Sequence, residues 1–346
     1  MSLHHIAARL RYAAKDWQTF LDQKYEGGKK KVRNPNPDTR DIYPEVSLTT
    51  AMSDDNFATH IEGEYKQWKG SQPKPKTKPK NIGKSLIGSL NIDAMISEHK
   101  DDIDKAYAQS LKDNSSMDIL DIVYTHHSMT VNKDLIVKTM SDLSDKDKFL
   151  LNGVQDLGKV FESRMASKPG NTSEKYFDLH DAWKEDSSEP EECKQIHAWL
   201  SKLHVSGSFE SDYENTVVSN TKIGKDFKSI LSEGYAYQQA VFKHLGITHV
   251  TLYRGVRDDQ LATVPPSHGD KVQIESRPAS SWSASPKTAQ SFGPRMIKSK
   301  VPVERILMSP ISYSQFGGAN SESEYVVIGA EDLEGEVFGE EVNHEY

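Results

Sequence analysis

Cysteine is almost absent from this sequence. Its 346 residues include a single cysteine, Cys193, which excludes an intramolecular disulfide and argues against a cysteine-rich zinc module. No run of about 18 consecutive apolar residues occurs, so the sequence contains no candidate membrane-spanning helix. Residues 1–17 also lack an uninterrupted apolar stretch, and we therefore expect no cleavable signal peptide. These absences predict a protein that works in a reducing compartment such as the cytoplasm.

Apolar residues are also few, at 36% of the chain, and the mean hydropathy is −0.67. The length nevertheless suffices for two or three units of about 100–200 residues each. Residues 1–84 carry a net charge of +6 and the remainder −14. An acidic body does not favour binding to nucleic acid, and we interpret the basic leader as largely solvated.

The clearest boundary is a segment in which proline alternates with lysine, residues 70–86. Proline excludes a regular helix there, and the repelling lysines extend the chain, so we predict a linker. It separates a helical N-terminal module, residues 1–69, from the main body, residues 87–346. The body divides into a mainly helical part, 87–245, and a β-rich part, 246–346.

Apolar spacing supports this division. Ile92, Ile96 and Ile103 recur on one helical face, and a second helical pattern ends at Gly246, where a C-terminal glycine is favoured. After Gly246, four short and roughly alternating segments predict strands: HVTLYRG, KVQIES, KVPVERILMS and ESEYVVIG. The sequence thus predicts an α+β protein.

Three pieces of the β-rich part carry chemistry. In the first, a strand ends in Arg254 followed by Gly255. An arginine at a strand end can present its planar fork to phosphate oxygens, and a glycine allows close approach to the backbone. On its own, this pair equally fits a surface ion pair.

The second piece is a serine cluster that runs from a strand into a helix. Ser281 and Ser283 lie two residues apart, so on a strand they point to the same side. Ser285 is a favoured N-cap residue ahead of a proline, and we expect Ala289 and Phe292 on the helix that follows.

The third piece is Glu322 and Glu324, which open an apolar strand. Two residues apart, they can face one cavity, and buried carboxylates are costly unless they are used. Upstream, we predict that residues 313–318 (YSQFGG) form a mobile loop that bears aromatic side chains.

In this order and spacing, the three pieces resemble the R-S-E class of mono-ADP-ribosyltransferases, a family of toxins and effectors. The resemblance covers residues 230–330, with Trp282 where the family usually has threonine. It implies an ADP-ribosyltransferase fold: two small packed sheets around an NAD cleft, preceded by a helical subdomain. Residues 1–85 show no resemblance.

The resemblance also implies roles for the motif residues, with NAD as substrate and no metal. Glu324 stabilises the positive charge that develops on the ribose, and Ser281 orients Glu324. Arg254 holds the NAD phosphates. Gly255 binds the nicotinamide amide through its backbone, and Ser281 and Ser283 also belong to the NAD-binding site.

Further implied contacts come from Phe292 and Arg295, in a loop over nicotinamide and phosphate. Glu322 positions the acceptor guanidinium and takes its proton, because the Glu-x-Glu variant of this class goes with arginine acceptors. The expected partner is a protein target that carries an acceptor arginine.

Several alternatives stay open. The acceptor can instead be a nucleic-acid base, another side chain or water, the last giving an NAD glycohydrolase. A binding module of the same fold without catalysis is a further alternative. An effector would act in the cytoplasm of a target cell after non-Sec secretion or carriage in a virion, with an immunity or delivery partner.

Residues of the helical part can be interpreted as a zinc site or as core residues, and we do not predict a zinc site. Cys193, His197 and His204 fall on one helical face, but no fourth zinc ligand is near in sequence. Trp183 and Trp199 are interpreted as core residues of the helical part.

Overall fold

A computed structural model provides the structure of the protein. It describes most of the chain beyond residue 81: residues 82–113, 144–152, 154–185, 190–203, 205, 221–257, 261, 269–274, 277–316, 323–329 and 333–338. Before that point it describes residues 20, 23–25, 31–34, 45–47, 51, 60–61 and 64. Most of the predicted N-terminal module and of the linker therefore lies outside the described residues.

The chain divides into two compact units. The first comprises residues 1–76 and 208–220, and the second comprises residues 77–207 and 221–346. In the first unit, strands β1 (Lys31–Arg33) and β2 (Glu45–Ser47) form an antiparallel pair, which the sequence did not predict.

The C-terminal end of the predicted linker is a helix of the second unit. Helix α5 (Ile82–Ile87) begins inside the range 70–86, and its residues Ile82 and Leu86 are buried in the core of that unit. The linker assignment is therefore wrong for residues 82–86, because two apolar side chains four residues apart give this stretch a buried helical face.

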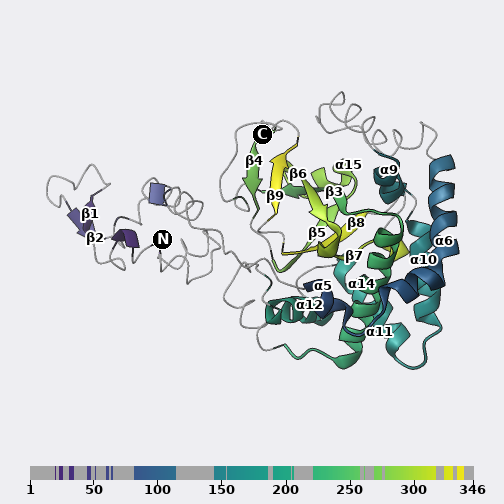
Figure 1. The fold of residues 1–346 in the computed structure, drawn as a ribbon. Helices are drawn as coiled ribbons and strands as arrows, with labels where there is room; N and C mark the ends of the chain where they lie inside the picture. Colours follow the sequence, from purple (N-terminus) through teal and green to yellow (C-terminus); the bar gives the residue numbers. More distant parts are fainter. Residues whose placement is uncertain are drawn as a thin grey trace. The chain divides into compact units, whose positions relative to one another are not determined.

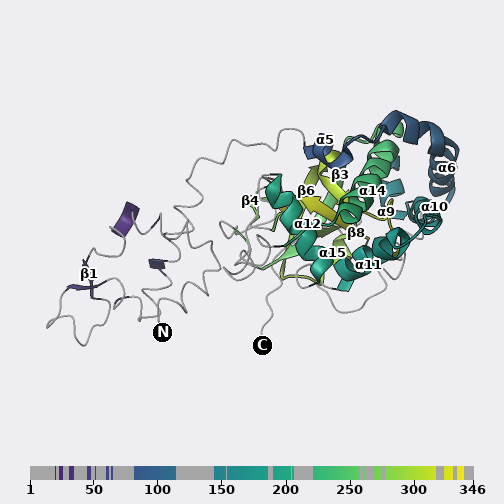
Figure 2. The same cartoon turned by 90° about the horizontal axis from the view of Figure 1, so that it is seen from below.

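The second unit is α+β, as predicted. Its other long helices are α6 (Ile92–Asp113), α9 (Asp145–Asn152), α10 (Gln155–Ala166), α11 (Thr172–Glu185), α12 (Glu191–Lys202) and α14 (Lys225–His244). α14 ends as the sequence predicts, since Gly246 adopts a φ of 61° just after the helix. In two views at right angles, α14 lies between the sheet and helices α6 and α10 (Figure 1, Figure 2).

The C-terminal hundred residues form an antiparallel sheet. Its strands are β3 (His249–Val256), β4 (Lys271–Gln273), β5 (Ala279–Ser283), β6 (Arg295–Pro302), β7 (Ile306–Met308), β8 (Glu324–Ile328) and β9 (Glu334–Val337). Their spatial order is β4-β9-β6-β3-β5-β8-β7. Short helices α15 (Pro286–Gln290), η3 (Val303–Arg305) and η4 (Ser314–Phe316) connect them.

The two small sheets expected from the resemblance are joined into one sheet of seven strands. β3 pairs with β6 over eight residues, and β5 pairs with β8 over five. Between these halves, β3 and β5 share a single pair, Tyr253 with Ser283. This narrow junction lies beside the predicted motifs.

None of the described helices is both long and apolar enough to cross a membrane.

Candidate active site

Glu324 occupies the first position of β8 and is buried, with 4% of its surface exposed. Its partner across the ladder is Ser283 on β5, and Ser281 lies two residues before Ser283 on the same strand. Because side chains alternate along a strand, Glu324, Ser283 and Ser281 share one face of the β5–β8 pair. The predicted serine and glutamate motifs therefore meet on neighbouring strands.

A tryptophan from the helical part completes this arrangement. The indole Nε1–H of Trp183, on α11, lies 3.0 Å from Oε1 of Glu324 and 3.1 Å from Oγ of Ser281. Trp183 is buried, as predicted for a core residue, and it also donates a hydrogen bond to Glu324 and Ser281. Sequence spacing carries no signal for this contact, because the residues are 98 and 141 positions apart.

The arginine motif lies at the junction of the sheet. Tyr253 pairs with Ser283, which in turn pairs with Glu324, and Arg254 is the next residue along β3. Neighbouring strands are about 4.8 Å apart, so the backbones at Arg254 and Glu324 lie within roughly 10 Å of each other. The three motifs are therefore close along the sheet, but Tyr253 shares the face of Ser283 and Glu324, so the side chain of Arg254 points to the opposite face at this register.

Arg254 has an unsatisfied buried nitrogen. Its Nη1 is buried and has no hydrogen-bond partner within the described part of the chain. Burial, followed by the like charge of Arg277, lowers the pKa of Arg254 to about 10. A buried guanidinium nitrogen without a partner is costly, and a phosphate oxygen would satisfy it. Arg254 is therefore suited to hold an anionic ligand.

Gly255 is packed against the chain itself. A Cβ added there would lie 2.1 Å from the carbonyl oxygen of Ala289 and 2.7 Å from the backbone nitrogen of Gly293. The end of α15 and the loop that follows make this close approach, whereas the prediction concerned the approach of a ligand. A contact of its backbone with nicotinamide remains a prediction.

The two remaining predicted residues, Phe292 and Arg295, lie between the end of α15 and the start of β6. Ser285 caps α15 as predicted, by accepting a hydrogen bond from the backbone N–H of Thr288. The helix ends at Gln290, so Phe292 is not on it, contrary to the prediction; the following turn leaves Phe292 56% exposed. Arg295 is buried and opens β6.

Arg295 and Arg254 share a face of the sheet. Arg254 pairs with Ile297, and Val256 pairs with Arg295. The two arginines are therefore offset by two residues on adjacent strands, and their side chains point to the same face. This placement is compatible with two cationic side chains that serve one phosphate-bearing ligand.

Backbone strain lies directly ahead of Glu324. Ser323 adopts a φ of 46°, which L-residues rarely adopt, and its carbonyl oxygen accepts a hydrogen bond from the backbone N–H of Ala284 at 3.0 Å. The turn into β8 is thus held by the neighbouring strand. Glu322 lies outside the described residues.

Residues 313–316, the described part of the predicted mobile loop, are packed, contrary to that prediction. Tyr313, Ser314 and Phe316 are buried, and the latter two lie on η4. The Ser314 backbone N–H and hydroxyl both donate to the carboxylate of Glu162, at 2.5 and 3.0 Å. The loop is fixed because helices α10 and α11 supply aromatic and acidic partners that local sequence does not reveal.

Aromatic contacts strengthen this packing. The ring of His180 on α11 lies 4.6 Å from that of Tyr313 and 5.5 Å from that of Phe316, between centroids. Burial lowers the pKa of His180 to about 4, and its Nδ1 is 2.8 Å from the carbonyl oxygen of Tyr176. His180 is therefore a neutral packing residue at physiological pH.

Metal ligands do not gather in the described part of the chain. No group of three or more histidine, cysteine, aspartate or glutamate side chains there could hold a metal ion. Cys193 is buried, and the ring of His197 packs against Trp183 at 5.7 Å. His204 lies outside the described residues.

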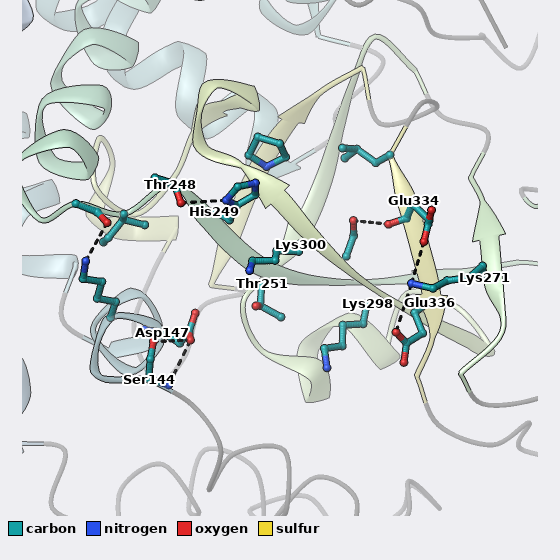
Figure 3. A pocket seen from close by; sticks show the side chains of 16 residues that line it. Ser144, Asp147, Thr248, His249, Thr251, Lys271, Lys298, Lys300, Glu334 and Glu336 are labelled. Atoms are coloured by element: carbon teal, nitrogen blue, oxygen red, sulfur yellow. Dashed lines mark hydrogen bonds and ion pairs between the residues drawn. The ribbon is translucent and has the colours of Figure 1, made fainter.

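A groove of about 710 Å³ lies elsewhere on the sheet (Figure 3). Its floor includes Thr251 of β3 with Lys298 and Lys300 of β6, and its wall includes Lys271, which pairs with Glu334. Thr251 lies two residues from Tyr253 on β3, so the groove opens on the face of the sheet that bears Ser283 and Glu324, opposite the side chain of Arg254. It is distinct from the cluster around Glu324, none of whose members lines it.

Comparison with known proteins agrees with this geometry. No curated protein and no solved structure matches the chain. A family model described as dinitrogenase reductase ADP-ribosyltransferase (DRAT) matches residues 162–333. The match begins in α10 and ends directly ahead of β9, so it includes Trp183, Arg254, Ser281 and Glu324. Residues 162–333 of this chain are therefore similar to an ADP-ribosyltransferase family.

Proposed function

We propose that the protein is a mono-ADP-ribosyltransferase that moves ADP-ribose from NAD to a protein arginine and releases nicotinamide. The main observation behind the proposal is that Arg254, Ser281 and Glu324 lie near one another on adjacent strands β3, β5 and β8, inside the matched region, with Ser281 and Glu324 on one face. The three motifs are spread over 71 positions of the sequence and come together only through the sheet.

The residues suit NAD in charge and in burial. The buried, unpaired Nη1 of Arg254 calls for an anionic oxygen, which a pyrophosphate supplies. Glu324 offers a fixed negative charge in a site with little water, where it stabilises positive charge far better than in solvent. NAD supplies a ribose whose bond to nicotinamide breaks with positive charge developing on the sugar, as in glycoside hydrolysis.

The proposed transfer balances without any further reactant. The bond between ribose carbon and nicotinamide nitrogen breaks, and its electron pair leaves with nicotinamide, which becomes neutral. A nitrogen of the acceptor arginine forms the new bond to the same carbon. The arginine then loses one proton, for which Glu322 is the proposed acceptor. Because a free guanidinium has a pKa above 12, this proton leaves as the new bond forms.

Labelled NAD tests this function directly. The protein should transfer label to an arginine-containing acceptor and hydrolyse NAD slowly in its absence. Since the matched family is named for dinitrogenase reductase, that protein is the first acceptor to test. Free ADP-ribose alone would favour an NAD glycohydrolase, and no turnover under any condition would contradict the proposal.

Glu322→Gln tests the acceptor assignment. The amide holds a guanidinium only weakly, so we expect loss of arginine modification while slow NAD hydrolysis largely persists. Undiminished transfer to the natural target would show that the acceptor is not arginine. Simultaneous loss of both activities would place Glu322 in the NAD site.

The toxin or effector role remains a separate prediction. If it holds, expression of the wild-type protein should arrest growth of a susceptible cell, and Glu324→Gln should abolish the arrest. Equal growth under both proteins would favour a regulatory transferase, in line with the matched family's name.

A further inference from the structure

We propose that Trp183 is a positioning residue for the catalytic carboxylate, and that its indole N–H fixes Glu324 and Ser281 in one arrangement. The inference rests on the proposed function and deepens it. It assigns to helix α11, which no motif marks, a direct part in organising the site.

The contact is a shared hydrogen bond. One N–H of Trp183 lies within hydrogen-bonding distance of two acceptors, Oε1 of Glu324 at 3.0 Å and Oγ of Ser281 at 3.1 Å. Trp183 and Glu324 are almost fully buried, with 2% and 4% of their surfaces exposed. Water is therefore a poor substitute for the indole, and losing the donor would remove a hydrogen bond from a buried carboxylate.

Each member of this cluster comes from a different element. Glu324 opens β8, Ser281 lies on β5, and Trp183 projects from the buried face of α11. The indole ring is also held from the side, since it packs against His197 of α12 at 5.7 Å between centroids. The donor thus comes from a packed helical layer, which limits how far the carboxylate can turn.

The chemistry of the indole decides what it can do here. Tryptophan donates a hydrogen bond but cannot accept one, so it pairs only with a lone pair of Glu324 and cannot take its proton. A charged carboxylate is a stronger acceptor for such a donor than a neutral group is. The ionised form is the one that stabilises positive charge on the ribose. A role in packing alone requires an aromatic ring but not the N–H, and phenylalanine supplies a smaller ring without it.

The test therefore removes the N–H and keeps an aromatic ring, with Trp183→Phe. Trp199→Phe is the matched control, because Trp199 is buried on the neighbouring helix and makes no hydrogen bond to Glu324 or Ser281 in the described part. We expect kcat for NAD hydrolysis to fall about 10–100-fold in Trp183→Phe, the range typical of residues that orient a functional group. The Kd for NAD should stay within about threefold of the wild-type value.

The split between kcat and Kd separates positioning from packing. If kcat of Trp183→Phe equals that of Trp199→Phe, the inference is overturned. If the Kd for NAD and the melting temperature change while kcat does not, Trp183 is a structural residue and the inference is also overturned. A fall in kcat at constant Kd and constant melting temperature supports it.

A second measurement needs no turnover. In a ¹⁵N-labelled protein, the indole N–H resonance of Trp183 is assigned by its absence from Trp183→Phe. It should shift upfield in Glu324→Gln, where a neutral amide replaces the charged acceptor, and stay in place in Glu334→Gln. An unmoved resonance in Glu324→Gln would overturn the contact. Failure of the wild-type protein to cleave NAD would instead overturn the proposed function, so the two failures are distinguishable.

Discussion

The hydroxyl of Tyr313 donates a hydrogen bond to the carboxylate of Asp181. Asp181 lies two residues before Trp183 on α11, and Tyr313 precedes the segment that leads to Glu324. One helix therefore contacts both ends of the stretch between residues 313 and 324, through Asp181 at its start and Trp183 at its end. The stretch between those two anchors includes Glu322.

Tyr313→Phe should affect transfer more than NAD hydrolysis. The substitution removes the hydroxyl that binds Asp181 but retains the ring, so the anchor ahead of Glu322 is lost while Trp183 and Glu324 keep their contact. We expect arginine modification to fall several-fold relative to hydrolysis, consistent with a hydrogen bond worth about 1 kcal/mol. Both rates are measured on one preparation with labelled NAD. Tyr107→Phe, on α6 in contact with Phe149, is the control, and equal loss of both activities would contradict the assignment.

Arg254→Lys should weaken NAD binding although the charge is retained. A lysine ammonium cannot reproduce the planar, bidentate contact that a guanidinium makes with phosphate. We expect the Kd for NAD, measured by calorimetry, to rise about tenfold, with the melting temperature little changed. Arg257→Lys, three residues along on an exposed position, should bind NAD as the wild type does. A wild-type Kd in Arg254→Lys would show that Arg254 does not touch NAD.

Gly255→Ala should destabilise the fold. The new Cβ would lie 2.1 Å from the Ala289 carbonyl oxygen, a distance that forces the backbone after α15 to move. We expect the free energy of unfolding in urea to fall by about 1–3 kcal/mol, as for other overpacked sites. Gly234→Ala is the control, because its Cβ would meet nothing closer than 3.8 Å and alanine favours a helix. Equal stability of the two variants would contradict the packing described for Gly255.

Truncation tests the boundary between the two units. A chain that begins at residue 77 retains α5 and should fold and hydrolyse NAD as the full chain does. A chain that begins at residue 89 loses the buried Ile82 and Leu86, each worth about 1.5–3 kcal/mol of burial, and should melt at lower temperature. If both truncations behave alike, α5 contributes nothing to the core. If the longer one is insoluble, residues 1–76 belong to the catalytic body.

Local patterns sufficed to predict the motif residues. The strand at Glu324, the cap at Ser285 and the helix end at Gly246 all depend on residues within a few positions of each other. The sequence therefore predicted which strands carry Arg254, Ser281 and Glu324. The adjacency of strands β3, β5 and β8 was expected only from the family resemblance, because strand order is a long-range property.

Most of the errors have a long-range cause. Phe292 was placed on a helix that ends at Gln290, and Tyr313 was placed in a mobile loop, although Glu162 and Asp181 hold that segment. The contact of Trp183 with Glu324 spans 141 positions and was not predicted. For Tyr313 and Trp183 the decisive partner lies far away in sequence, where neither periodicity nor spacing carries information, whereas the end of α15 involves only neighbouring residues.

The most direct test of the account is the rate of NAD cleavage by Glu324→Gln. The substitution keeps the shape of the side chain and removes its charge, which is the property assigned to it. We predict a fall of at least about 10²–10³-fold in NAD hydrolysis, with an unchanged circular dichroism spectrum and melting temperature. Glu334→Gln, an exposed carboxylate on β9 that pairs with Lys271, should cleave NAD at the wild-type rate. Cleavage by Glu324→Gln within a few-fold of wild type would contradict the account.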